Sequence, residues 1–146
     1  MPVATYLEID GRHDHSIRIP RPDRTASIGV PNACAGCHAD KPAEWAVNAV
    51  APWTRRGVSG NQRFAESFAA DDRGAVDAVA ALLSVARDPG ASSIARASAF
   101  ARLSRYRDTA IVSSVRTGAV DRDPLVRRWA IEAMTLAADD AKLEVL

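Results

Sequence analysis

Two stretches in the second half of the chain share one side-chain pattern, and this internal repeat constrains the fold more than any other feature. Residues 94–103 align with residues 125–134, and in both an arginine, a small residue and a large apolar residue recur at helical spacing. An Asp-Pro pair precedes each stretch, at Asp88-Pro89 and at Asp123-Pro124. Because proline ends one helix and suits the first turn of the next, the pattern predicts antiparallel helical hairpins.

The composition favours a mostly α protein and argues against two classes of partner. Alanine supplies about a fifth of the 146 residues and aromatic residues only 5%, which favours closely packed helices. The 19 basic and 18 acidic side chains leave a net charge of +1, so the chain lacks the positive excess that binds nucleic acid. No apolar stretch reaches the about 18–20 residues of a membrane span, and the first residues do not read as a signal peptide.

The repeat pattern resembles HEAT-type helical repeats. Residues 123–130 match the D-P-x-V-R-x-x-A pattern that often starts the second helix of such a repeat. The resemblance covers roughly residues 75–140 and implies stacked helical hairpins, with residues 61–87 as a further half unit. Two units, or two and a half, are few for a self-standing solenoid, because each repeat needs neighbours to bury its faces. We expect a linker and connecting helix over residues 54–74 and the HEAT-like repeat region over residues 75–146.

The first 32 residues carry no sustained helical or strand period. Prolines and glycines interrupt them at Pro2, Gly11, Pro20, Pro22, Gly29 and Pro31. Only residues 6–9 and 17–19 alternate enough to predict short extended pieces. A helix is expected from Pro42 to about Val50, with Asp40 as its N-cap. The irregular segment is too poor in periodic apolar residues to build a core by itself.

Both cysteines of the chain lie in one short stretch, Cys34-Ala35-Gly36-Cys37-His38. Two thiols at this CxxCH spacing can each add to one vinyl group of haem, and the adjacent imidazole then reaches the iron from the same side. The motif therefore predicts covalently attached haem. The porphyrin would also supply the apolar surface that the N-terminal segment lacks.

Three other interpretations of the cysteine pair stay open. A thioredoxin-like redox pair needs a preceding strand and a βαβ frame, which the upstream sequence does not provide. A zinc site would combine Cys34, Cys37 and His38 with His13 or His15, although this spacing matches no common zinc finger. A structural disulfide or two free thiols is the third alternative.

The second axial ligand of the iron is expected among the histidines. The chain has three, His13, His15 and His38, and its only methionines are Met1 and Met134. With His38 on one face of the iron, the loop carrying His13 and His15 has a suitable length to reach the other, which favours a bis-histidine iron. The arginines that follow this loop are candidates to pair with the haem propionates: Arg18, Arg21 and Arg24.

Residues 14–22 together with residues 29–41 resemble the last haem-binding stretch of bacterial multihaem c-type cytochromes that carry helical repeats behind the haem domain. The resemblance spans about residues 1–53. It implies covalent haem c as an iron cofactor, His38 and His15 as metal-binding axial ligands, and one-electron transfer rather than enzymatic catalysis. It further implies a periplasmic location and redox partner proteins.

The chain departs from that family in having one haem motif and no export signal. Relatives often read Cys-His-Met-Pro where another motif ends, and this chain opens with Met1-Pro2. We therefore expect a C-terminal fragment of a longer protein that carries further haems. Two alternatives remain: a helical-repeat adaptor that binds another protein and has a zinc or disulfide at Cys34 and Cys37, and a multihaem reductase in which this chain is a relay.

Overall fold

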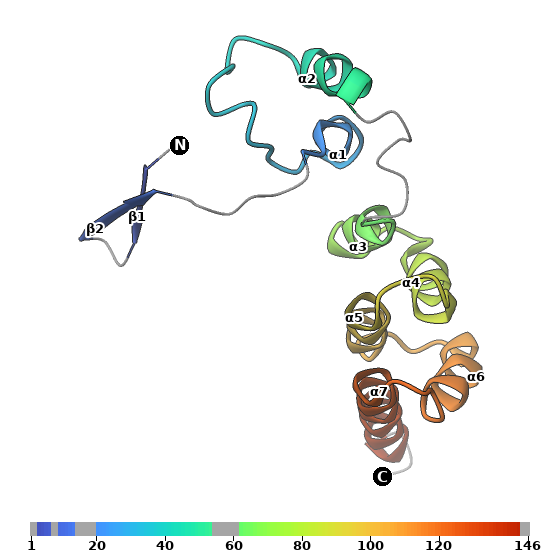
Figure 1. Ribbon diagram of the computed structural model, residues 1–146. Helices are drawn as coiled ribbons and strands as arrows, with labels where there is room; N and C mark the ends of the chain where they lie inside the picture. The colour runs from blue at the N-terminus through green and yellow to red at the C-terminus, as the bar shows by residue number, and fades with distance from the viewer. Residues whose placement is uncertain (1–2, 7–8, 14–19, 54–61, 144–146) are drawn as a thin grey trace. The chain divides into compact units, whose positions relative to one another are not determined.

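The computed structural model describes residues 3–6, 9–13, 20–53 and 62–143, and within these ranges the chain is mostly helical, which confirms the expected class (Figure 1). The chain divides into two compact units, Met1–Asn61 and Gln62–Leu146. Among the described residues no helix is both long and apolar enough to cross a membrane.

The first unit opens with a two-stranded antiparallel hairpin. Strand β1 (Val3–Tyr6) pairs with β2 (Asp10–His13), with Val3 opposite His13. The prediction of a loop over the polar stretch that forms β2 is wrong. All four residues of β2 are exposed, so backbone hydrogen bonds form this strand without apolar alternation. The predicted extended piece at residues 17–19 lies outside the described residues.

Two short helices follow in the first unit and pack against each other. Helix α1 (Pro22–Ile28) corrects the prediction that no helix precedes residue 32. Pro22 is its first residue and Gly29 ends it with a positive φ of 74°, so these two residues are the start and stop signals of a helix and not interruptions. The packing of the two helices buries little apolar surface: Pro22 on α1, and Ala46 and Val50 on the helix that follows.

Helix α2 (Ala43–Val50) confirms the helix expected in this region and leads into a 3-10 turn, η1 (Ala51–Trp53). The prediction that Asp40 caps it is wrong. Pro42 occupies the N-cap position and no side chain caps the helix. The Asp40 carboxylate instead pairs with the ammonium group of Lys41 at 2.9 Å.

The second unit is a stack of five helices among its described residues. They are α3 (Ala65–Asp72), α4 (Ala78–Arg87), α5 (Ser93–Leu103), α6 (Thr109–Gly118) and α7 (Pro124–Leu143). Helix α4 contacts α3 and α5, and α6 contacts α7, while α5 also contacts α7 and α4 contacts α6. Figure 1 shows the result as two rows, with α3, α5 and α7 in one and α4 and α6 in the other.

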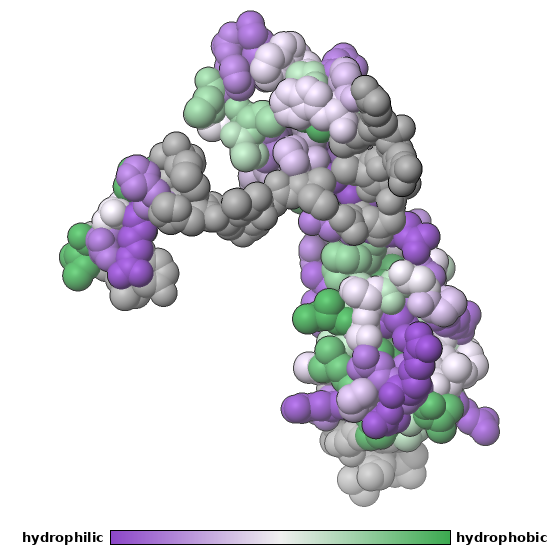
Figure 2. Space-filling view, viewed as in Figure 1, coloured by the Kyte–Doolittle hydropathy of each residue, from purple (hydrophilic) through white to green (hydrophobic). Residues whose placement is uncertain are grey.

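The aligned stretches occupy equivalent places on α5 and α7. Ala95 and Ala99 on α5 are buried, as are Val126 and Ala130 at the matching positions on α7. Phe100 is only 1% exposed because α6 and α7 cover it, whereas its counterpart on α7, Ile131, is 47% exposed. On the face of this unit seen in Figure 2, hydrophobic residues lie as separate patches among polar ones.

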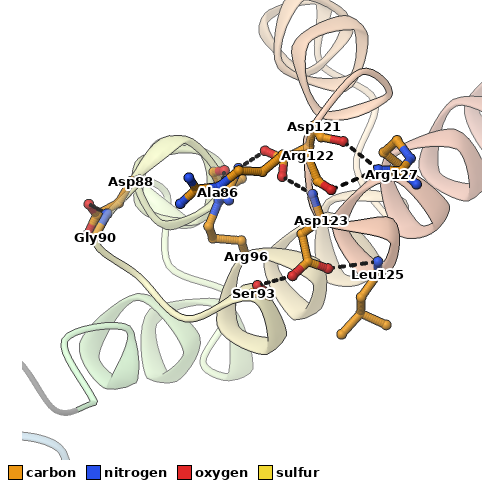
Figure 3. Close-up of polar contacts among 10 residues, drawn as sticks. All are labelled: Ala86, Asp88, Gly90, Ser93, Arg96, Asp121, Arg122, Asp123, Leu125 and Arg127. Carbon is orange, nitrogen blue, oxygen red and sulfur yellow. Dashed lines mark hydrogen bonds and ion pairs between the residues drawn. The ribbon is translucent and has the colours of Figure 1, made fainter.

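Two equivalent arginines tie the turns of the stack together (Figure 3). Arg96 on α5 donates to the Ala86 carbonyl oxygen in the last turn of α4 at 3.4 Å. Arg127 on α7 donates to the Asp121 and Arg122 carbonyl oxygens beyond α6 at 2.8 and 3.0 Å. Arg96 therefore faces the negative end of α4, and Arg127 bonds the connection that follows α6. Arg96 also pairs with the Asp121 carboxylate.

A buried carboxylate joins α3 to the end of α5. The Asp71 side chain is 1% exposed and accepts hydrogen bonds from Arg102 and Arg105, both at 2.5 Å, and from the Tyr106 hydroxyl at 2.6 Å. Burial alone disfavours its charged form, but the hydrogen bonds and positive charges outweigh burial and hold the pKa of Asp71 below its ordinary value. The Arg102 guanidinium also lies 4.6 Å from the centre of the Phe68 ring. Asp71 thus has a structural role, because it holds α3 to the residues at and just beyond the end of α5.

Candidate functional site

The CxxCH stretch forms a single helical turn between α1 and α2. The amide N–H groups of Cys37 and His38 both donate to the Cys34 carbonyl oxygen, at 3.2 and 2.9 Å. These are the i to i+3 and i to i+4 bonds of one helical turn. Residues at these spacings share a face of the turn, so Cys34, Cys37 and His38 belong to one side of it.

The three side chains of this turn are accessible. Cys34 is half-buried, and Cys37 and His38 are exposed. Both thiols are free rather than joined in a disulfide. Two accessible thiols and one imidazole on the same face of a turn are what a haem attached at two sulfurs and one iron position requires, so the residues present fit that group.

Asn32 fixes the start of the turn, a role that our sequence analysis missed. Its side-chain oxygen accepts hydrogen bonds from the amides of Cys34 at 2.9 Å and Ala35 at 3.1 Å. Its side-chain nitrogen donates to the Thr25 hydroxyl on α1 at 2.8 Å. Asparagine two residues before a turn is a recognised signal for this bonding to the backbone, so the local part of the role was open to prediction. The bond from Asn32 to Thr25 on α1 could not be predicted from the sequence.

Trp45 contacts His38 and was also missed. The indole and imidazole ring centres lie 4.6 Å apart with the planes tilted by 48°. Trp45 is in the first turn of α2, where its amide donates to the Pro42 carbonyl oxygen at 3.1 Å. The Lys41 amide donates to the His38 carbonyl oxygen at 3.0 Å, so a tight backbone turn leads from His38 toward α2. The sequence spacing alone carried no signal for this ring contact.

The structure does not describe every residue that we expected near the iron. His15 and Arg18 lie outside the described residues. His13 is exposed on β2, in the same unit as the turn. Arg21 is engaged with Asp23, to which it donates at 2.7 Å, and these hydrogen bonds hold the pKa of Asp23 below its usual value. A propionate would have to share Arg21 with this carboxylate.

The described residues contain no group of three or more histidine, cysteine, aspartate or glutamate side chains placed to hold a metal ion together. A shallow groove runs between α1 and α2, and neither the cysteines nor His38 borders it. Its lining residues are Asp23, Ala26, Ser27, Glu44, Val47 and Asn48. Comparison of the chain with protein-family models, with curated proteins and with solved structures gives no match.

Proposed function

We propose that this chain is the haem-bearing part of a multihaem c-type cytochrome that transfers electrons in the periplasm. The observation that carries the proposal is the helical turn that presents Cys34, Cys37 and His38 on one face, with both thiols free. Haem c, when bound, supplies an iron that cycles between its ferric and ferrous states. The chain is then an electron carrier and not itself an enzyme.

Each residue of the turn has a separate role in holding the cofactor. Cys34 and Cys37 would hold the porphyrin covalently, each S–H adding across one vinyl group to give a thioether. His38 provides the proximal nitrogen ligand. Asn32 holds the backbone of the turn to α1 through its hydrogen bonds to the Cys34 amide and to Thr25.

His15 is the proposed second axial ligand, with His13 as the substitute. Two imidazole ligands saturate the iron and favour electron transfer over substrate binding. In a longer protein His15 would be able to ligate a haem attached upstream. Replacement of His15 with alanine, compared with the same change at His13, distinguishes the two ligands by which variant loses the low-spin spectrum.

We propose that the second unit is a short HEAT-like stack on which redox partner proteins dock. Supporting this, α5 contacts α7 and α4 contacts α6, as expected of stacked hairpins. Arg96 and Arg127, at equivalent positions, also each donate to a backbone carbonyl oxygen of the segment that precedes their own helix. A solenoid offers a long surface for a protein partner.

The decisive experiment is covalent haem capture. The full chain, placed behind a secretion signal, is expressed with haem maturation machinery, and the product is examined by pyridine haemochrome assay and intact mass. We expect one haem mass added per chain and colour that survives acid-acetone extraction.

The matched control is the Cys34→Ser and Cys37→Ser double variant, which keeps the size of the side chains and removes both thiols. It should carry no covalent haem. Colourless wild-type protein with stoichiometric zinc would instead support the helical-repeat adaptor. Colourless protein with two alkylatable thiols and no metal would overturn both readings of the motif.

A further inference from the structure

The imidazole of His38 is exposed, yet one aromatic side chain already lies against it. Within the described part of the chain the His38 ring has no hydrogen-bond partner. Its ring contact is with Trp45, at 4.6 Å between centres and a tilt of 48°. Tilted aromatic pairs at this separation are attractive beyond the area they bury, because the positive ring edge meets the negative face.

Trp45 is well placed to hold a neighbouring ring still. It sits on α2, which is anchored to the rest of its unit by the buried side chains of Ala46 and Val50. Its own side chain remains 38% exposed, so the indole has not been drawn into a core and is available on the side of the turn. A free histidine side chain loses rotational freedom when it binds, and a neighbour that restricts it beforehand lowers that loss.

We propose that Trp45 is a positioning residue for His38, which orients the imidazole before and during its binding as an axial ligand. This inference rests on the proposed function, because it assigns the role through the haem iron. The residue does not touch the iron. It acts through the ring contact, in the way that outer partners orient the histidines of other metal sites.

The contact predicts a signature in the full chain expressed without haem. The Trp45 ring current should shift the His38 ring protons upfield in the NMR spectrum. The shift should vanish in Trp45→Leu and largely return in Trp45→Phe, which restores an aromatic ring. Trp53→Leu is the matched control, since this second tryptophan of the same unit is 75% exposed and its removal leaves the ring pair intact.

The haem-loaded chain supplies the second measurement, the high-spin fraction of the ferric haem by electron paramagnetic resonance. Weaker binding by His38 raises this fraction. We expect about a two- to tenfold rise in Trp45→Leu, the factor that aromatic pairs contribute to an equilibrium, with a smaller rise in Trp45→Phe and no change in Trp53→Leu.

The two hypotheses fail in different ways. Wild-type protein that captures no haem overturns the proposed function and this inference with it. Haem capture with the same spin state in wild type and Trp45→Leu leaves the proposed function in place and overturns the positioning role. An equal change in Trp53→Leu also overturns it, because the effect would then not depend on the ring contact.

Discussion

The Gly118→Ala substitution tests how tightly the helices of the second unit approach. A Cβ atom at Gly118 would lie 2.5 Å from Phe100 Cζ and 2.8 Å from both Phe100 Cε2 and Ala130 Cβ. Carbon atoms pack best at about 3.5–4.0 Å, so each overlap is near 1 Å. Phe100 and Ala130 are 1% and 0% exposed, so neither can move into solvent to relieve it.

The expected effect is the difference of two opposing contributions. Overpacking in a filled core destabilises by about 1–3 kcal/mol. Alanine in a helix stabilises by up to about 1 kcal/mol relative to glycine, and less here because Gly118 is the last residue of α6. The free energy of unfolding should therefore fall by about 1–2.5 kcal/mol, which lowers Tm by roughly 5–15 °C for a unit of this size.

Urea unfolding followed by circular dichroism measures this change, with an unaltered m value as the sign that only stability has shifted. In a Phe100→Leu background, where the ring atoms are gone, the penalty of Gly118→Ala should drop by at least about 1 kcal/mol. Gly90→Ala is the control, since the nearest atom to its Cβ is the end of the flexible Arg63 side chain. A Gly118→Ala protein as stable as wild type, or an equal penalty in both backgrounds, would refute the close approach.

Three further changes test the polar contacts. Asp71→Asn should destabilise the second unit by about 1–3 kcal/mol in thermal unfolding at pH 7, because it leaves Arg102 and Arg105 with a weaker acceptor. Since folding lowers the pKa of Asp71, its contribution is complete above the ordinary value of 3.8 and is lost as pH falls through the lower folded value, so the variant should lose less stability than wild type on acidification from pH 5 to pH 3. Asp123→Ala removes the acceptor for the Ser93 hydroxyl and for the Leu125 amide and should cost about 1–2 kcal/mol in the same assay, whereas an unchanged midpoint would exclude that capping role. Asn32→Ala should speed amide hydrogen exchange at Cys34 by roughly fivefold or more, and equal exchange in both proteins would show that the side chain does not hold the turn.

Several structural features follow from residues close together in the chain. The apolar spacing predicted α5 and α7, and Asp123-Pro124 predicted the start of α7 at Pro124, since proline and side-chain period act within one or two turns of backbone. The position of α2 followed in the same way. The expectation for Pro89 is wrong, because α5 begins at Ser93 with Ser92 as its N-cap. Helix α1 is also encoded locally, because Pro22 and Gly29 are signals for the start and the end of a helix.

The candidate site also has some features that depend on local sequence and others that depend on tertiary packing. The CxxCH spacing predicted that Cys34, Cys37 and His38 lie on one side of a turn, because bonds from residue i to i+3 and i+4 are local along the chain, although Asn32 also ties this turn to α1. Only the tertiary structure decided that Trp45 meets the imidazole and that Asp71 is buried among arginines. Such contacts depend on how helices cross and how the connections return them, and no spacing along the chain encodes that geometry.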